Sequence, residues 1–139
     1  MKQEDKELLL KDLCARLPYG VKCLVNYTFC NETTDYEDVK SSTVDTLITI
    51  NQQTESYFFG WLFEWFDVDE FKPYIFPLSS MTVEQRKEYY TMVKYNITSK
   101  DNAKLMDWLN KNHFDYRGLI EKSLALDATN LGIYEKGAE

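Results

Sequence analysis

The N-terminal part of the chain carries apolar side chains at the spacing of a helix. Leu9, Leu13 and Leu17 recur at every fourth position and therefore lie on one side of a helix. This spacing predicts a helix from about residue 4 to Arg16. Pro18 ends the helix, because the residue before a proline avoids the helical backbone conformation.

The next segment changes to the alternating pattern that is typical of strands. Apolar or aromatic residues alternate with polar ones over residues 21–30 and again over 44–50. The polar and mostly acidic segment 31–42 between them is predicted to be a loop or a long hairpin connection. In the second strand, Val44, Thr46, Ile48 and Ile50 share one face.

Residues 57–66 form the most apolar run of the chain. We interpret the run as one strand with aromatic side chains on both faces, which must both be covered. It is therefore either a central strand covered by the chain's own helices or in part a surface for another protein. A homodimer is the simplest version of the second reading. The candidate partner-binding residues are Phe58, Leu62, Phe66, Trp61 and Trp65.

The second half of the chain turns from extended to helical patterns. Residues 71–78 contain two prolines and suit an edge strand or an extended cover, because proline cannot donate to a central ladder. Thr82 and Gln85 match a capping box, which predicts a helix from about residue 83 to 95. The tail after about residue 128 is predicted to be loosely ordered.

The stretch 107–122 holds the densest mixture of residue types and predicts a helix, a tight corner and a second helix. Leu105, Trp108 and Leu109 share one face of the first helix. Asp115 is placed to cap the second helix, since its carboxylate can accept the free N–H groups. The polar residues of the corner form either a recognition or catalytic site or a hydrogen-bonded cluster that fixes the corner. They are His113, Asp115, Tyr116 and Arg117.

Together these elements predict an α+β fold. We expect a small antiparallel sheet, with an SH3-like barrel as one form that it can take. An N-terminal helix and a C-terminal helical section would pack against it. The chain has 139 residues, and residues 1–139 are expected to form a single domain. A hydrophobic content of 44% suffices for a core without disulfides or metal.

Charge and composition exclude several classes of function. The formal net charge of -7 disfavours nonspecific binding to nucleic acid or to an anionic membrane. We find neither a signal peptide nor an apolar run of membrane-spanning length, and expect a soluble, cytoplasmic protein. Cys14, Cys23 and Cys30 lack metal-site spacing and suit reduced thiols. With a single histidine and few glycines, the sequence predicts no metal and no cofactor.

Three segments of the chain carry a resemblance: residues 8–22, residues 72–74 with 77–82, and residues 107–122. The third, Asp-Trp-Leu-Asn-x-x-His-Phe-Asp-Tyr-Arg-Gly-Leu-Ile-Glu-Lys, is the most specific. They resemble a family of small uncharacterised proteins of gut bacterial genomes and their phages and prophages. The middle of the chain departs from the family pattern, as does Ser123, where the family usually has Gly. The family has no established activity, so the resemblance implies a setting in mobile elements and no mechanism.

The sequence favours one class of function by elimination. We expect a non-enzymatic, protein-binding accessory protein of a phage or other mobile element. One alternative is a small enzyme with its site near His113, Asp115 and Arg117. Another is an acidic decoy of nucleic acid that acts on a host protein, which the net charge permits.

Overall fold

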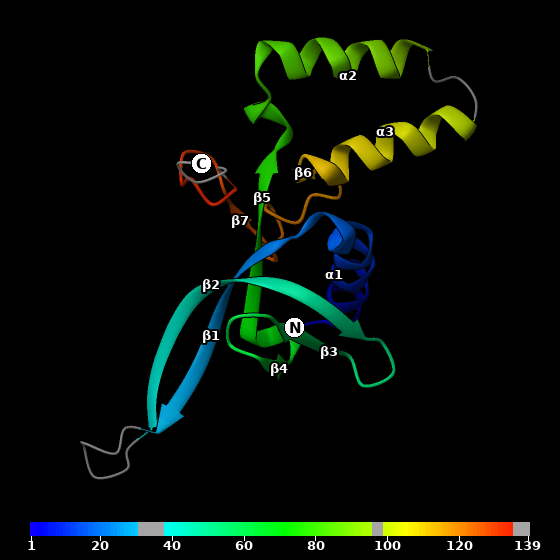
Figure 1. Cartoon of the computed structure of the whole chain (residues 1–139). Coiled ribbons are helices and arrows are strands. Elements are labelled where there is room, and N and C mark those ends of the chain that lie inside the picture. Colours follow the sequence, from blue (N-terminus) through cyan, green and yellow to red (C-terminus); the bar gives the residue numbers. More distant parts are fainter. Residues whose placement is uncertain (31–37, 96–98, 135–139) are drawn as a thin grey trace. The chain divides into compact units, whose positions relative to one another are not determined.

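The computed structural model describes residues 1–30, 38–95 and 99–134 (Figure 1). Within these residues it has three α-helices and seven strands, and it confirms the predicted α+β class. The strands pair mostly antiparallel, and they do not close into an SH3-like barrel. The helices are α1 (Gln3–Arg16), α2 (Val83–Tyr95) and α3 (Ser99–Lys111), with short 3-10 helices η1 (Leu17–Tyr19), η2 (Val68–Glu70) and η3 (Leu78–Ser80). The strands are β1 (Lys22–Cys30), β2 (Asp38–Asn51), β3 (Ser56–Phe59), β4 (Glu64–Phe66), β5 (Phe71–Pro77), β6 (Phe114–Asp115) and β7 (Leu126–Asp127).

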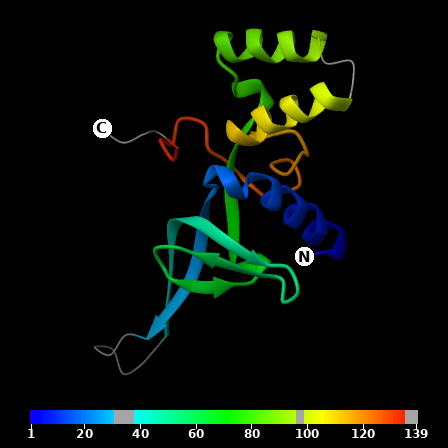
Figure 2. The ribbon, with the colours of Figure 1, turned by 45° about the vertical axis from the view of Figure 1, so that its right-hand side comes forward.

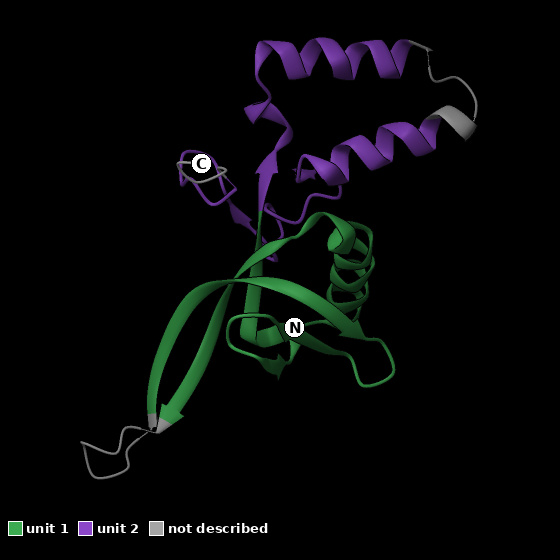
Figure 3. Ribbon diagram, viewed as in Figure 1, with its two compact units in different colours: residues 1–74 green, residues 75–139 purple. Residues whose placement is uncertain are grey.

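The chain divides into two compact units, residues 1–74 and 75–139, which we call unit 1 and unit 2 (Figure 3). Strand β5 gives its first part to unit 1 and its second part to unit 2. The single domain expected for residues 1–139 stays a prediction.

Unit 1 contains an antiparallel sheet in the order β4-β3-β2-β1-β5. Strands β1 and β2 form a long ribbon that is paired along the whole of β1. Strand β5 pairs with only the first part of β1, at residues 23–25, and its later part pairs with β6 and β7, so it is not the edge strand that its prolines suggested. The β3–β4 hairpin pairs with the end of β2, and α1 lies beside the sheet (Figures 1 and 2).

Helix α1 forms where the leucine spacing predicts it. Leu9 and Leu13 are fully buried. The chain leaves the helix at Arg16 and passes through η1, which contains Pro18. Gly20 then takes a φ of 71°, a left-handed conformation that glycine adopts without steric cost. The turn directs the chain from the helix into β1.

Aromatic rings fill the core of unit 1. The rings of Tyr57 and Phe59 lie 4.9 and 5.1 Å from the ring of Phe71, in the edge-to-face arrangement that aromatic pairs prefer. Phe66 is buried with them, 5.8 Å from Phe59. Burial is the main cause that raises the pKa of Tyr57 to about 12. The Tyr57 hydroxyl is therefore neutral at physiological pH.

Strand β2 is longer than predicted. It begins at Asp38, inside the segment 31–42 that we expected to be a connection, and extends to Asn51. Residues 31–37 of that segment lie outside the described residues. Pairing with β1 extends β2 into a polar sequence, because strand formation depends on neighbouring strands more than on intrinsic propensity.

The buried face of β2 is the one opposite to the face that carries Val44 and Ile48. Ile48 is 53% exposed and Val44 is also exposed, whereas Asp45 and Leu47 are buried. A carboxylate can be buried where backbone N–H groups bind it, and Asp45 meets that condition, as its contacts show below.

Unit 2 is organised around the second part of β5 and a pair of helices. Helix α2 begins with the predicted capping box. The Thr82 N–H donates to the Gln85 side chain at 2.9 Å, and the Gln85 N–H donates to the Thr82 hydroxyl at 3.1 Å. Helix α3 runs beside α2 in both views (Figures 1 and 2). Met81, Leu109 and Phe114 are the buried centre of this unit.

Trp108 lies on the edge of that centre. Leu109 is buried as predicted, while Leu105 and Trp108 are half-buried. The Trp108 ring stacks on Phe114 at 5.6 Å, and its indole N–H donates to the Glu88 carboxylate at 2.9 Å. Trp108 therefore joins α3 to α2 through both packing and a hydrogen bond.

The second helix predicted after Asp115 is not formed. The chain runs through turns there, and Gly118 and Ser123 take φ values of 74° and 60°. The Asp115 carboxylate instead accepts the N–H groups of Leu119 and Ile120, both at 3.0 Å. A left-handed residue interrupts helical hydrogen bonding, so the local capping signal at Asp115 produces a turn.

Ser123→Gly is expected to raise the free energy of unfolding by about 0.5 kcal/mol, because it removes the steric cost of a left-handed serine. A urea melt measures the change. Ser79→Gly is the matched control, since Ser79 has no positive φ, and it should lower stability by roughly 0.5–1 kcal/mol. Equal effects of the two substitutions would contradict the assignment of strain to Ser123.

The tail after about residue 128 is described up to residue 134. The Leu131 N–H donates to the Ala128 carbonyl at 3.2 Å, and the Tyr134 ring stacks on His113. Residues 135–139 lie outside the described residues, and the loosely ordered tail stays a prediction. Among the helices of the described chain, none has the length and apolarity needed to cross a membrane.

Candidate functional site

The aromatic run 57–66 folds as a hairpin and not as the single strand that we predicted. Strands β3 and β4 are joined by a turn at residues 60–63, with Phe58 opposite Trp65 and Phe59 opposite Glu64. Because opposite residues share a face, the hairpin has two different sides. One side enters the core of unit 1 and the other side carries Phe58 and Trp65.

The turn and the outer side of the hairpin expose large aromatic side chains. Trp61 is 75% exposed, Phe63 79% and Trp65 48%. Phe58, which is half-buried, lies 5.2 Å from both the Phe63 ring and the Trp65 ring. We call Phe58, Trp61, Phe63 and Trp65 the hairpin aromatics. An exposed aromatic group of this kind marks an interaction surface more often than a single exposed side chain does.

A buried carboxylate holds the turn in place. Asp45 accepts the Trp61 N–H with both oxygens, at 3.0 and 3.1 Å, and the Leu62 N–H at 2.8 Å. It also accepts the N–H of its neighbour Thr46 at 2.7 Å. Charge-assisted hydrogen bonds of this kind are among the strongest in proteins. Asp45 thereby fixes the backbone from which Trp61 projects.

The backbone at Phe63 is in a conformation that a bulky residue rarely adopts. Its φ is 54°, in the left-handed region where glycine is preferred, and its N–H donates to the Phe59 carbonyl at 2.9 Å. Folding alone does not account for a phenylalanine here, since the side chain is mostly exposed. Strained backbone of this kind is concentrated at functional positions.

The five predicted partner-binding residues fall into three groups. Trp61 and Trp65 are exposed, Phe58 and Leu62 are half-buried, and Phe66 is buried in the core at 5% exposure. The single-strand reading therefore placed Phe66 on the wrong side. It also left out Phe63, the most exposed aromatic of the run. Gly60 was the signal for the turn, because a glycine inside a strand pattern indicates a bend.

The structure brings the predicted polar residues of the corner into internal contacts. Tyr116 donates its hydroxyl to the Asn110 side chain at 2.9 Å, and Arg117 donates to the Tyr116 oxygen at 3.1 Å. His113 is buried and stacked on Tyr134 at 3.9 Å. Both oxygens of Asp115 accept backbone N–H groups. These contacts fit a cluster that fixes the corner.

Among the described residues, no site for metal or thiol chemistry is assembled. In the part of the chain that the structure describes, no group of three or more His, Cys, Asp or Glu residues is placed to hold a metal ion. Cys14 and Cys23 are free thiols. Burial, and then the nearby charge of Asp45, raises the pKa of Cys23 well above its usual value. Cys23 is therefore a protonated core residue and not a nucleophile.

Comparison with known proteins adds no assignment to this geometry: the chain matches no family model, no curated protein and no solved structure.

Proposed function

We propose that the protein is a non-enzymatic accessory protein that binds another protein through the hairpin aromatics. The observation that carries the proposal is the exposure of Trp61 and Phe63, at 75% and 79%. Large aromatic side chains are the commonest anchors of protein interfaces, because they bury much area with few rotatable bonds. A homodimer remains the simplest form of partner.

The rigidity of the turn supports recognition over incidental exposure. Asp45 binds the backbone of Trp61 and Leu62, so the turn is ordered before any partner arrives. Preorganisation lowers the entropic cost of association. A phenylalanine is kept at a left-handed position although glycine would fold there more easily. The left-handed position of Phe63 costs stability, and binding gives a reason for it.

The setting of the proposed function rests on the sequence. The resemblance of residues 107–122 to a family of gut bacterial and phage proteins supports a role in a mobile element, and the reduced-thiol composition supports the cytoplasm. No observation specifically favours the small enzyme or the acidic decoy. The polar corner groups are engaged in internal contacts, as described above.

Phe63→Gly tests the proposal, because it should separate binding from folding. The substitution should leave the free energy of unfolding unchanged or raise it by up to about 1 kcal/mol, since glycine relieves the left-handed strain. Binding should weaken by at least about 30-fold, the effect of losing an aromatic anchor worth about 2 kcal/mol. Trp61→Ser should weaken binding similarly.

The readouts are light scattering at micromolar concentration for self-association and affinity purification from the host, with and without phage. Tyr90→Ser is the matched control, because Tyr90 is 68% exposed on α2 in unit 2. The control should keep the partner that the Phe63 and Trp61 variants lose. A partner that stays bound to all three variants, or a wild-type protein that binds none, would refute the proposal.

A further inference from the structure

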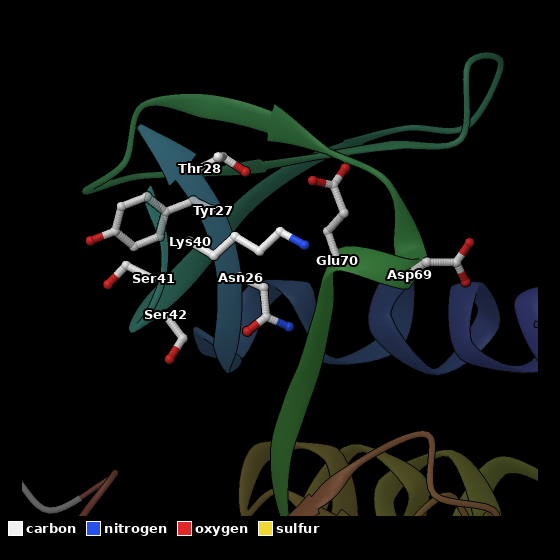
Figure 4. A pocket seen from close by; sticks show the side chains of 8 residues that line it. All are labelled: Asn26, Tyr27, Thr28, Lys40, Ser41, Ser42, Asp69 and Glu70. Carbon is white, nitrogen blue, oxygen red and sulfur yellow. The ribbon is translucent and has the colours of Figure 1, made fainter. Parts of the chain in front are cut away.

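A concave site lies on unit 1, away from the hairpin aromatics in sequence. It has a volume of about 670 Å³ and lies between the β1–β2 ribbon and η2 (Figure 4). We call it the edge cleft. Its volume is in the range of ligand pockets in proteins, about 300–1,000 Å³, and it is lined mostly by polar residues. The volume and the polar lining of the cleft suit a short ligand that forms hydrogen bonds.

The cleft borders a part of β1 that lacks a strand on one side. Strand β5 pairs with β1 at residues 23–25 and no further, because the chain before Phe71 is coiled into η2. The Glu70 N–H is turned away from β1 and donates to the Asp67 carbonyl at 3.0 Å. Among the described residues, therefore, no strand is paired with the later part of β1 on this side.

The register shows which backbone groups face the cleft. Pro73 lies opposite Cys23 and has no N–H, so the hydrogen-bonded pair between the two strands is Leu24 with Lys72. Because hydrogen-bonding direction alternates along a strand, the N–H and C=O of Thr28 point to the same side of β1 as those of Leu24, which is the side where β5 pairs. Thr28 lines the cleft. An extended peptide placed there would find a donor and an acceptor at strand spacing.

The side chains of the cleft favour a positively charged ligand. Asp69 and Glu70 line it from η2, and Lys40 reaches toward Glu70 from β2 (Figure 4). The Glu70 carboxylate also accepts the Asp67 N–H at 3.0 Å, which fixes its position. Two carboxylates against one ammonium leave the lining net negative. The charge of the cleft thus complements a lysine or an arginine.

We propose that the edge cleft binds an extended segment of a partner protein that carries Lys or Arg and adds to β1 as a strand. The segment pairs its backbone with Thr28 and places a basic side chain near Glu70, the acid that lies beside Lys40 in the cleft (Figure 4). Strand addition of this kind gains affinity from main-chain hydrogen bonds and specificity from alternate side chains. It also completes a ribbon of two strands, which is marginally stable by itself. This surface is independent of the hairpin aromatics.

The test uses a set of end-blocked hexapeptides in which Lys or Arg alternates with Val, Thr or Tyr, titrated into the full chain labelled with ¹⁵N. Members of the set should bind saturably, shift the Thr28 amide signal and slow its hydrogen exchange by about tenfold or more. A matched set with Glu in place of Lys and Arg should not bind. The proposal is overturned if no cationic peptide shifts the Thr28 signal or if the Glu set binds equally well.

Two controls define the geometry and the charge. N-methylation of the peptide positions whose N–H faces β1 should abolish binding. N-methylation of the alternate positions should preserve binding. Equal binding of both methylated peptides would exclude strand addition. Glu70→Gln, which keeps an acceptor for the Asp67 N–H, should weaken the binding of the cationic peptides about threefold, and Glu84→Gln, an exposed acid of α2, should not. Phe63→Gly should leave the peptides bound, which separates this proposal from the function of the hairpin.

Discussion

Arg16→Ala is expected to lower the free energy of unfolding by about 3–5 kcal/mol, because it leaves the buried Asp12 carboxylate without its cation. Asp12 and Arg16 face each other one turn apart on α1, and both are fully buried. The Arg16 Nε and Nη2 atoms donate to the two Asp12 oxygens at 2.7 and 3.2 Å. A loss of this size would remove a large part of the stability of an ordinary domain.

The matched control replaces both partners at once. The double variant Asp12→Leu with Arg16→Met should recover most of the loss, since a buried ion pair is often no more stabilising than apolar residues of similar volume. Urea melts of the wild type, of Asp12→Leu, of Arg16→Met and of the double variant form a complete cycle. An Arg16→Ala protein that unfolds at the same urea concentration as the wild type would show that the pair is not desolvated in solution.

Where a structural feature depends on a few neighbouring residues, the sequence was sufficient to predict it. The helix limits at Arg16 and the capping box of Thr82 with Gln85 follow from local rules and are confirmed. The spacing of Asp12 and Arg16 was equally visible, but their burial was not. Burial depends on what other elements cover a helix face, and periodicity of apolar residues says nothing about buried charges.

The candidate site was predictable only in part, because its geometry depends on a contact between distant residues. The aromatic content of residues 57–66 was correctly singled out, and Trp61 and Trp65 are exposed. The hairpin turn depends on Asp45, sixteen residues before Trp61. Asp45 occupies the strand face that a period-two reading assigns to solvent. The sequence also gave no sign that β5 stops short of Thr28, which creates the edge cleft.

Asp45→Ala is expected to lower the free energy of unfolding by about 3 kcal/mol and to release the turn that displays the hairpin aromatics. The substitution removes an acceptor from the N–H groups of Thr46, Trp61 and Leu62. Hydrogen bonds to a charged group are worth about 1.5–3 kcal/mol each, but they share one carboxylate and do not add. Urea melts measure the loss of stability. Amide exchange at residues 61 and 62 should quicken by more than this loss of global stability explains.

Asp45→Asn and Asp69→Ala test whether the charge of Asp45 causes the loss of stability. Asparagine keeps the shape of aspartate but offers one acceptor oxygen. The free energy of unfolding of Asp45→Asn should therefore fall by an intermediate amount, about 1–2 kcal/mol. Asp69 is exposed on the same unit, and its loss should change stability by less than about 0.5 kcal/mol. If Asp45→Asn exchanged like the wild type at residues 61 and 62, the charge would not be what orders the turn; if Asp45→Ala did so as well, Asp45 would not order the turn at all. Preorganisation would then no longer support binding by Trp61 and Phe63, and only their exposure would remain as its basis.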